Sequence, residues 1–281
     1  MTLVLFGLFF LFMLLGVPIA FAIGASSLYA LYQSGVPLMV VTQQMFQGIN
    51  SFALVAIPMF ILAGDLMAQG KVSERLVGFA DSLVGFMRGG LSVVSVMAGM
   101  FFAAISGSGA ATTAAVGSSL VPELKRKGYD PASAASLIAA SGTIGVVIPP
   151  SVPMIIYAVI AQQSVSELFL NGFLPGLAMG LGLMAIAIAQ AYKRQYPKGT
   201  PLSLTTIWHT FKDASWGLMT PVIILGGIFS GIFTPSEAAV VAVNYAMLVS
   251  LFVYRDLNLQ QIYKLLIRSA MTTAGIMLVI A

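Results

Sequence analysis

Apolar stretches long enough to enter or cross a lipid bilayer follow one another along almost the whole chain, and short polar segments separate them. A spanning helix needs about 20 apolar residues, with about 17 as the lower bound. The apolar stretches are 3–15, 19–32, 52–67, 91–121, 132–161, 169–192, 217–232 and 235–254, and a further one begins near residue 270. The pattern predicts a multi-pass membrane protein. The first two stretches flank a Gly-Val-Pro break and are interpreted as two short crossings, with one broken helix as the alternative.

Every lysine and arginine of the chain, 13 in total, falls into one of four short clusters between the apolar stretches. The clusters are Lys71, Arg75 and Arg88; Lys125, Arg126 and Lys127; Lys193, Arg194, Lys198 and Lys212; and Arg255, Lys264 and Arg268. Basic residues near membrane segments stay on the cytoplasmic side. If all four clusters face the cytoplasm, the direction of nearly every crossing is fixed.

The composition excludes a soluble protein. Apolar residues make up 59% of the 281 positions and charged residues only 8%, against about 25% charged in soluble domains. The net charge of +4 reflects the basic clusters, so no nucleic-acid partner is expected. The chain has no cysteine, which excludes disulfides and cysteine-bound metals. The apolar N-terminus lacks the basic segment that begins a signal peptide and is interpreted as a membrane segment.

Two stretches are expected to lie on the inner membrane surface rather than cross it. In 72–87, apolar residues recur at helical spacing while charged residues occupy the other face, a pattern typical of interfacial helices. Residues 202–215, which contain the only histidine, His209, form the second candidate. The uncharged segment 33–51 is expected to be an outer connection with an interfacial helix.

The stretch 91–121 starts near Arg88 and returns to Lys125, so both of its ends are inside. Its centre is Ser-Gly-Ser-Gly at 106–109. The second limb, 110–121, has 12 residues, or about 18 Å, which is shorter than the roughly 30 Å hydrocarbon core. We therefore expect a re-entrant hairpin with its tip near mid-membrane. Two ordinary spans joined by a Gly-Ser turn are the alternative.

The stretch 132–161 is interrupted at 142–151, which includes a Pro-Pro pair at 149–150. Prolines lack an N–H group, so they cannot bond the carbonyls four residues back, those of Gly145 and Val146. Irregular backbone at membrane depth is tolerated only where it is buried in protein or lines a cavity. We therefore expect a broken helix at a binding site.

The hairpin tip and the helix break together offer groups of both charges. Carbonyl ends of helices that finish near Ser106 and Gly142, with nearby hydroxyls, suit Na⁺. Helices that begin near Ala110 and Ser151 direct free N–H groups and positive dipole ends at the same region, which favours a carboxylate. Tight helix packing also enriches small residues in membranes, but it does not explain a Pro-Pro pair at mid-membrane.

An internal repeat appears at a fixed offset of 217, where Pro18 falls on Pro235, Ala22 on Ala239 and Ala53 on Ala270. An odd number of crossings separates the two starts, so the second copy is inverted. Inverted repeats are typical of secondary transporters. We expect an all-α polytopic membrane protein, with the first repeat and the truncated start of the second in these residues.

Four motifs in combination resemble the large membrane subunit of TRAP (tripartite ATP-independent periplasmic) transporters. They lie at residues 50–60, 106–113, 142–151 and 234–239, and the resemblance covers essentially the whole chain. It implies an elevator-type importer in the bacterial inner membrane that couples an organic acid anion, such as sialic acid or a C4-dicarboxylate, to Na⁺ without an organic cofactor. It also implies two partners, a small four-helix membrane subunit and a periplasmic substrate-binding protein. The family's second hairpin and second broken helix are absent from this sequence.

The resemblance implies an organisation into four parts. Residues 1–50 would be scaffold helices of repeat 1, and 163–216 a linking helix followed by an inner surface helix. The truncated start of repeat 2 would be 217–281. The transport domain of repeat 1 would be 51–162, with a crossing helix at 52–67, the hairpin at 91–121 and the broken helix at 132–161.

The expected site residues follow from the tip, the break and the helix N-termini. The resemblance implies that Na⁺ is bound by Ser106, Gly107, Ser108, Gly109, Thr143, Gly145, Val146, Pro149 and Pro150. Substrate binding is assigned to Ser108, Ala110, Thr112 and Ser151. No catalytic residue and no metal other than Na⁺ is expected. Asp65 is interpreted as an interfacial, packing or coupling residue near the inner end of its crossing, and Glu237 as a helix cap.

Three other functions are weighed against this interpretation. A standalone Na⁺-coupled dicarboxylate or citrate carrier of the same superfamily is the main alternative, and co-purification with a binding protein would distinguish the two. A membrane-embedded hydrolase would need an intramembrane Ser/His pair, paired aspartates or a His/Glu cluster, and the sequence shows none. A passive channel would need a ring of pore-lining charge, which the sequence lacks, and a measured uptake stoichiometry would test this alternative.

Overall fold

The computed structural model describes residues 1–199 and 201–281, and within them every regular element is a helix. The elements are α1 (Thr2–Leu14), α2 (Ile19–Gln33), α3 (Met39–Ile49), η1 (Phe52–Val55), α4 (Ala56–Gln69), α5 (Val72–Val84), α6 (Gly90–Ser106), α7 (Gly109–Arg126), α8 (Pro131–Thr143), η2 (Ile144–Val146), α9 (Val152–Ile160), α10 (Val165–Lys193), α11 (Leu204–Phe229), α12 (Pro235–Leu248), η3 (Val249–Val253) and α13 (Leu259–Ile280). The fold is all-α, as the sequence predicts.

Four of the described helical segments are long and apolar enough to cross a membrane. They are Phe52–Gln69, Val165–Lys193, Pro235–Val253 and Leu259–Ile280. The predicted first crossings are separate helices, α1 and α2, that pack against each other, and not one broken helix. With 13 and 15 residues they are shorter than the roughly 20 residues of a straight span.

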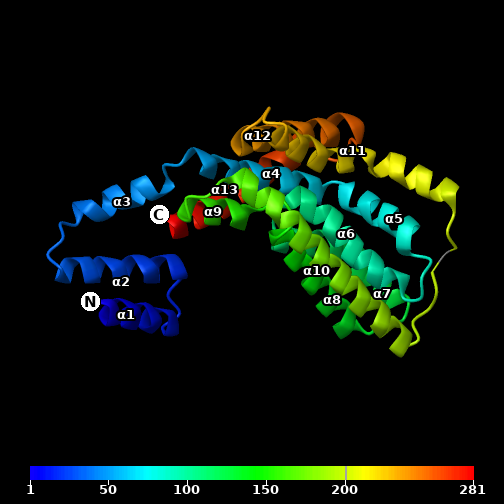
Figure 1. The fold of residues 1–281 in the computed structure, drawn as a ribbon, viewed down its shortest axis with the longest axis horizontal. Helices are drawn as coiled ribbons and strands as arrows, with labels where there is room; N and C mark the ends of the chain where they lie inside the picture. Colours follow the sequence, from blue (N-terminus) through cyan, green and yellow to red (C-terminus); the bar gives the residue numbers. More distant parts are fainter. Residues whose placement is uncertain (200) are drawn as a thin grey trace.

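The segment α1–α3 forms an arm that extends away from most of the other helices and contacts them at the end of α13 (Figure 1). No residue of α1 or α3 is buried, and α2 buries only the small residues Ala22, Ser26 and Ala30. Exposed apolar faces of this kind are stable where lipid or protein covers them. The arm is therefore built to lie in a membrane or against further protein.

Helix α4 lies at the centre of the hydrophobic core. Phe60, Leu66 and Met67 are fully buried, and the most extensive helix pairing in the described structure is that of α4 with α12. A hydrogen bond of 2.8 Å from Ser236 Oγ to the Phe52 carbonyl fixes the start of α12 beside the start of this crossing. The start of α12 is thus packed into the core around α4.

Helix α10 packs along one side of the hairpin and the broken helix (Figure 1). Gly172, Gly176 and Gly180 are buried at four-residue spacing on one face of it, a pattern that lets helix backbones approach closely in membranes. A Cβ atom added to Gly172 would lie 2.8 Å from the Val147 carbonyl oxygen. Helix α10 therefore supports the break directly.

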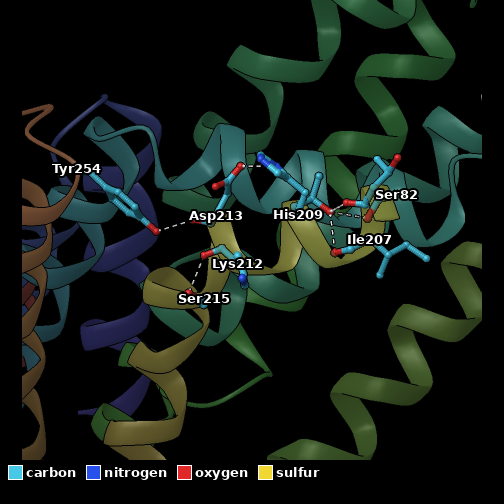
Figure 2. Close-up of polar contacts among 9 residues, drawn as sticks. Ser82, Ile207, His209, Lys212, Asp213, Ser215 and Tyr254 are labelled. Carbon is cyan, nitrogen blue, oxygen red and sulfur yellow. Dashed lines mark hydrogen bonds and ion pairs between the residues drawn. The ribbon is translucent and has the colours of Figure 1, made fainter. Parts of the chain in front are cut away.

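The structure corrects the expected boundary between an inner surface helix at 202–215 and a crossing at 217–232. Residues 204–229 form one uninterrupted helix, α11, because neither the Trp-Gly pair at 216–217 nor Pro221 breaks it. Its first half packs on α5. Thr210 Oγ1 donates to Ser82 Oγ of α5 (2.9 Å). Figure 2 shows the same region, where the Tyr254 hydroxyl donates to the Asp213 carbonyl (2.8 Å).

His209 lies on the exposed side of α11, where its Nδ1 is 3.2 Å from a carboxylate oxygen of Asp213 (Figure 2). Within the described residues no group of three or more His, Cys, Asp or Glu side chains is arranged to hold a metal ion. His209 is accordingly a surface residue of the helix, as the sequence analysis interpreted it.

Asp130 ties the hairpin and broken helix to the end of α10. It caps α8 by accepting hydrogen bonds from the Ser133 amide (3.0 Å) and hydroxyl (2.7 Å), and Arg194 lies 3.0 Å from the same oxygen. These hydrogen bonds from Ser133, and then the Arg194 guanidinium, hold the pKa of Asp130 below its ordinary value. The carboxylate stays charged at neutral pH, and the two segments stay joined.

Candidate functional site

The predicted hairpin is formed by α6 and α7, and its tip touches the predicted helix break. Gly107 joins the two helices with a φ of +61°, which glycine adopts without strain. The Gly107 carbonyl accepts a 3.1 Å hydrogen bond from the amide of Val152, the first residue of α9. The hairpin tip and the start of α9, which are far apart in the sequence, are therefore joined by a backbone hydrogen bond.

Glycines make this contact possible. A Cβ atom added to Gly145 would lie 2.6 Å from Thr112 Oγ1 and 2.9 Å from the Ser108 carbonyl oxygen. One added to Gly109 would lie 2.9 Å from the Gly142 carbonyl oxygen. Real Cβ contacts are essentially never this short, so the tip and the break require glycine on both sides.

Hydroxyl and carbonyl oxygens are concentrated at the tip. Ser106 Oγ and Thr112 Oγ1 lie 3.0 Å apart, and the Thr112 hydroxyl also reaches the Ser108 carbonyl at 2.8 Å. The Ser106 and Thr112 side chains are buried. Unwound backbone carbonyls and neighbouring oxygens are the groups that coordinate Na⁺ in transporters with broken helices.

The break lies at the predicted place but satisfies one carbonyl in an unexpected way. Helix α8 ends at Thr143, η2 follows, and α9 begins at Val152. The Val146 carbonyl, expected to be free, accepts a 2.7 Å hydrogen bond from the Ser151 hydroxyl. A carbonyl oxygen has a second lone pair, so this bond orients the group without using all of its capacity.

A cavity of about 540 Å³ lies beside the tip. Of the predicted site residues, its wall contains Ser106, Gly107, Ser108, Gly109, Ala110 and Val146. Five other predicted site residues are buried and do not line the cavity: Thr112, Gly145, Pro149, Pro150 and Ser151. Thr143 lies apart from these residues, because its side chain is exposed and its hydroxyl donates to the Ala140 carbonyl of its own helix.

Two charged residues of the cavity wall, Asp65 and Arg268, were not among the predicted site residues. Asp65 belongs to α4, and its Oδ2 accepts a 2.7 Å hydrogen bond from the Ser269 hydroxyl of α13. From the sequence, Arg268 was expected to belong to a cytoplasmic basic cluster with Arg255 and Lys264. The spacing Arg268, Thr272, Ile276 was the available signal, since residues four apart share one helix face.

The chain was compared with known protein families and curated proteins. Residues 6–281 match the family described as tripartite ATP-independent periplasmic transporter, DctM component.

The chain belongs to this family.

Curated relatives within the DctM family carry transporter permease names. The chain is 43% identical to the isethionate TRAP transporter permease protein DctMQ of Oleidesulfovibrio alaskensis, over 99% of the chain and 44% of the relative. It is 39% identical to the C4-dicarboxylate TRAP transporter large permease protein DctM of Rhodobacter capsulatus, over 99% of the chain and 67% of the relative. It is 37% identical to the sialic acid TRAP transporter permease protein SiaT of Haemophilus influenzae, over 95% of the chain and 44% of the relative.

Membership of the DctM family agrees with the resemblance stated from the motifs and with a multi-pass membrane protein. The relatives are named as permeases and not as enzymes. The chain spans between 44% and 67% of the length of these three relatives.

Proposed function

We propose that this chain forms part of a secondary transporter in the bacterial inner membrane that imports an organic acid anion together with Na⁺. One observation carries the proposal: the hairpin tip and the helix break meet at the wall of one cavity. Gly107, Ser108 and Val146 line it, with the N-termini of α7 and α9 beside them. In transporters with broken helices, such carbonyls coordinate cations while half-helix N-termini hold anionic groups.

Coupling of the two ions follows from electrostatics. A single charge inside the membrane is costly, and a neighbouring opposite charge lowers that cost. Na⁺ at the oxygens around the tip would lie next to the helix N-termini at Ser108 and Ser151, which favour an anion. The two ions therefore bind more favourably together than separately, which is the thermodynamic basis of symport.

The substrate class and the partners rest on the family. The three relatives named above carry isethionate, C4-dicarboxylate or sialic acid in their names, and all of these are organic anions at neutral pH. By analogy, a periplasmic binding protein would deliver the anion, and a small membrane subunit would complete the membrane part. The separation of the α1–α3 arm from the hairpin and broken helix suits an elevator motion of one part against the other (Figure 1).

Uptake into proteoliposomes tests the proposal. The assembled transporter would be given an inward Na⁺ gradient and radiolabelled succinate, isethionate or N-acetylneuraminate. We expect little uptake without the cognate binding protein and restored uptake with it. Uptake that needs no binding protein would favour a standalone carrier, and uptake indifferent to Na⁺ would refute the coupling.

The depth of the hairpin tip gives a separate prediction. Helix α7 continues to Arg126, so the second limb has 18 residues instead of the expected 12. Its length of about 27 Å is close to the thickness of the hydrocarbon core, so length alone does not distinguish a re-entrant hairpin from two spans. The contact between the tip and the break supports the re-entrant form, because the break lies near the middle of the segment from Pro131 to Ile160.

Cysteine labelling measures this depth, because residues 1–281 contain no other cysteine that the reagent could label. Ala110 is exposed in the cavity wall and tolerates a side chain, whereas Gly107 does not. A membrane-impermeant thiol reagent added outside resting vesicles is expected to leave Ala110→Cys unlabelled and to label Gln163→Cys in the exposed loop after α9. Strong labelling of both, unaffected by Na⁺ and substrate, would establish two full spans.

A further inference from the structure

Arg268 lies in the cavity wall, although the basic cluster that contains it in the sequence did not predict this position. It sits in the interior of α13, and Thr272 and Ile276 of the same helix face line the same cavity. The wall also contains Ser108 and Ala110 of the hairpin. Arg268 is the only basic residue of this wall among the described residues. Its charge is therefore presented to the space that the tip and the N-termini of α7 and α9 surround.

Among the described residues, Arg268 is an exposed arginine whose guanidinium has no partner, unlike the other arginines. The others are Arg75, stacked over the Tyr254 ring at 3.6 Å; Arg88, bonded to the Tyr196 carbonyl; Arg126, paired with Glu123; Arg194, paired with Asp130; and Arg255, bonded to the Phe252 carbonyl. Within the described part of the chain, the Arg268 guanidinium makes no hydrogen bond, ion pair or aromatic contact. The Arg268 guanidinium therefore keeps its hydrogen-bond donors available for an anion in the cavity.

The other charged group of the wall is already engaged. Asp65 accepts the 2.7 Å hydrogen bond from Ser269, the residue next to Arg268. Asp65 follows Gly64, where an added Cβ atom would lie 3.0 Å from the Ser106 backbone of the hairpin tip. The Asp65–Ser269 bond thus connects α13 to the helix that contacts the tip, and it holds the part of α13 that carries Arg268 beside the cavity.

We propose that Arg268 binds the carboxylate or sulfonate of the transported anion in this cavity, together with the helix N-termini that line it. The proposal rests on the proposed function and adds the residue that selects for anionic charge. A guanidinium presents a planar fork of donors that matches a carboxylate with two parallel hydrogen bonds. The dipole ends of α7 and α9 supply only partial positive charge. Arg268 contributes a full charge from a different helix, so the anion is held between two parts of the protein.

Substrate kinetics in the assembled transporter test the role. The probe is whichever of succinate, isethionate and N-acetylneuraminate the wild type takes up. Arg268→Gln is expected to raise KM for that anion by about ten- to hundredfold, the effect of losing a charge-assisted hydrogen-bonded pair. The KM of Arg268→Lys is expected to lie between those of the wild type and Arg268→Gln, because an ammonium keeps the charge but cannot form two parallel hydrogen bonds. The half-saturating Na⁺ concentration at saturating anion should stay near that of the wild type.

Lys264→Gln provides the matched control. Lys264 lies one turn before Arg268 on α13, is exposed, and is absent from the cavity wall. Its removal changes the net charge equally and should leave KM unchanged. Unchanged KM in Arg268→Gln, or an equal rise in both variants, would overturn the proposal. So would a reduced melting temperature in Arg268→Gln that Arg268→Lys restores while KM stays at the wild-type value, because that result assigns a structural role.

A binding measurement separates this inference from the proposed function. Purified protein in detergent would be titrated with the anion and with its neutral amide, and thermal stabilisation would be followed. The wild type should discriminate between the two ligands, and Arg268→Gln should lose that discrimination. Such discrimination together with uptake indifferent to Na⁺ supports the role of Arg268 and refutes the coupling. Na⁺-driven uptake with equal discrimination in both proteins refutes the role of Arg268 alone.

Discussion

Na⁺-driven uptake is expected to fall roughly tenfold or more when Gly145 is replaced by alanine. The added methyl group would lie 2.6 Å from Thr112 Oγ1 and 2.9 Å from the Ser108 carbonyl oxygen, so the hairpin tip and the break must move apart. Overpacking of this kind costs about 1–3 kcal/mol. The displaced oxygens are those proposed to hold Na⁺, and initial uptake rates at several Na⁺ concentrations would show a raised half-saturating concentration.

Gly182→Ala is the control for this variant. Gly182 lies in α10, and a Cβ atom added there would meet no atom within 4 Å. It should transport at the wild-type rate at equal expression. Wild-type Na⁺ dependence in Gly145→Ala would show that the close approach of the tip and the break is not needed for binding.

The double substitution of Pro149 and Pro150 by alanine is expected to abolish most Na⁺-coupled uptake. Alanine restores two N–H groups, and these could bond the Gly145 and Val146 carbonyls and continue the helix through the break. The Val146 carbonyl would then exchange its bond to Ser151 for a bond within the helix. Uptake and its Na⁺ dependence would be measured at matched expression.

Pro221→Ala is the corresponding control, because Pro221 lies inside the continuous helix α11 and outside the cavity wall. It should leave the Na⁺ dependence unchanged. Full Na⁺-coupled uptake in the double variant would refute the proposed role of the break in Na⁺ binding.

The sequence predicted the hairpin and the break well because both depend on local chemistry. A glycine between two helices and a pair of prolines leave the backbone few alternatives, so the tip at 106–109 and the break at 142–151 occur where the pattern placed them. The extent of the helices was harder to predict. The charged residues at the end of α7 and the Trp-Gly pair in the middle of α11 were interpreted as boundaries, whereas the helix continues through both.

The positions that could not be predicted depend on contacts between distant segments. Arg268 belongs by spacing to a basic cluster, and only the packing of α13 on α4 turns it toward the cavity. The bond from Ser151 to the Val146 carbonyl depends on how tightly the chain turns at the break. The exposed hydroxyl of Thr143 likewise follows from the exact rotation of the last turn of α8.

The pairing of α4 with α12 has a consequence for synthesis of the protein. Translation proceeds at about 5–20 residues per second, so α12 leaves the ribosome on the order of ten seconds after α4. During that interval the face of α4 that α12 later covers has to be sheltered by lipid or by the insertion machinery. The small residues Ala238, Ala239 and Ala242 on the buried face of α12 offer little bulk to hinder its late docking. Assembly of the core is therefore post-insertional, and a ribosome stalled before Pro235 would leave a chain exposed to membrane proteases.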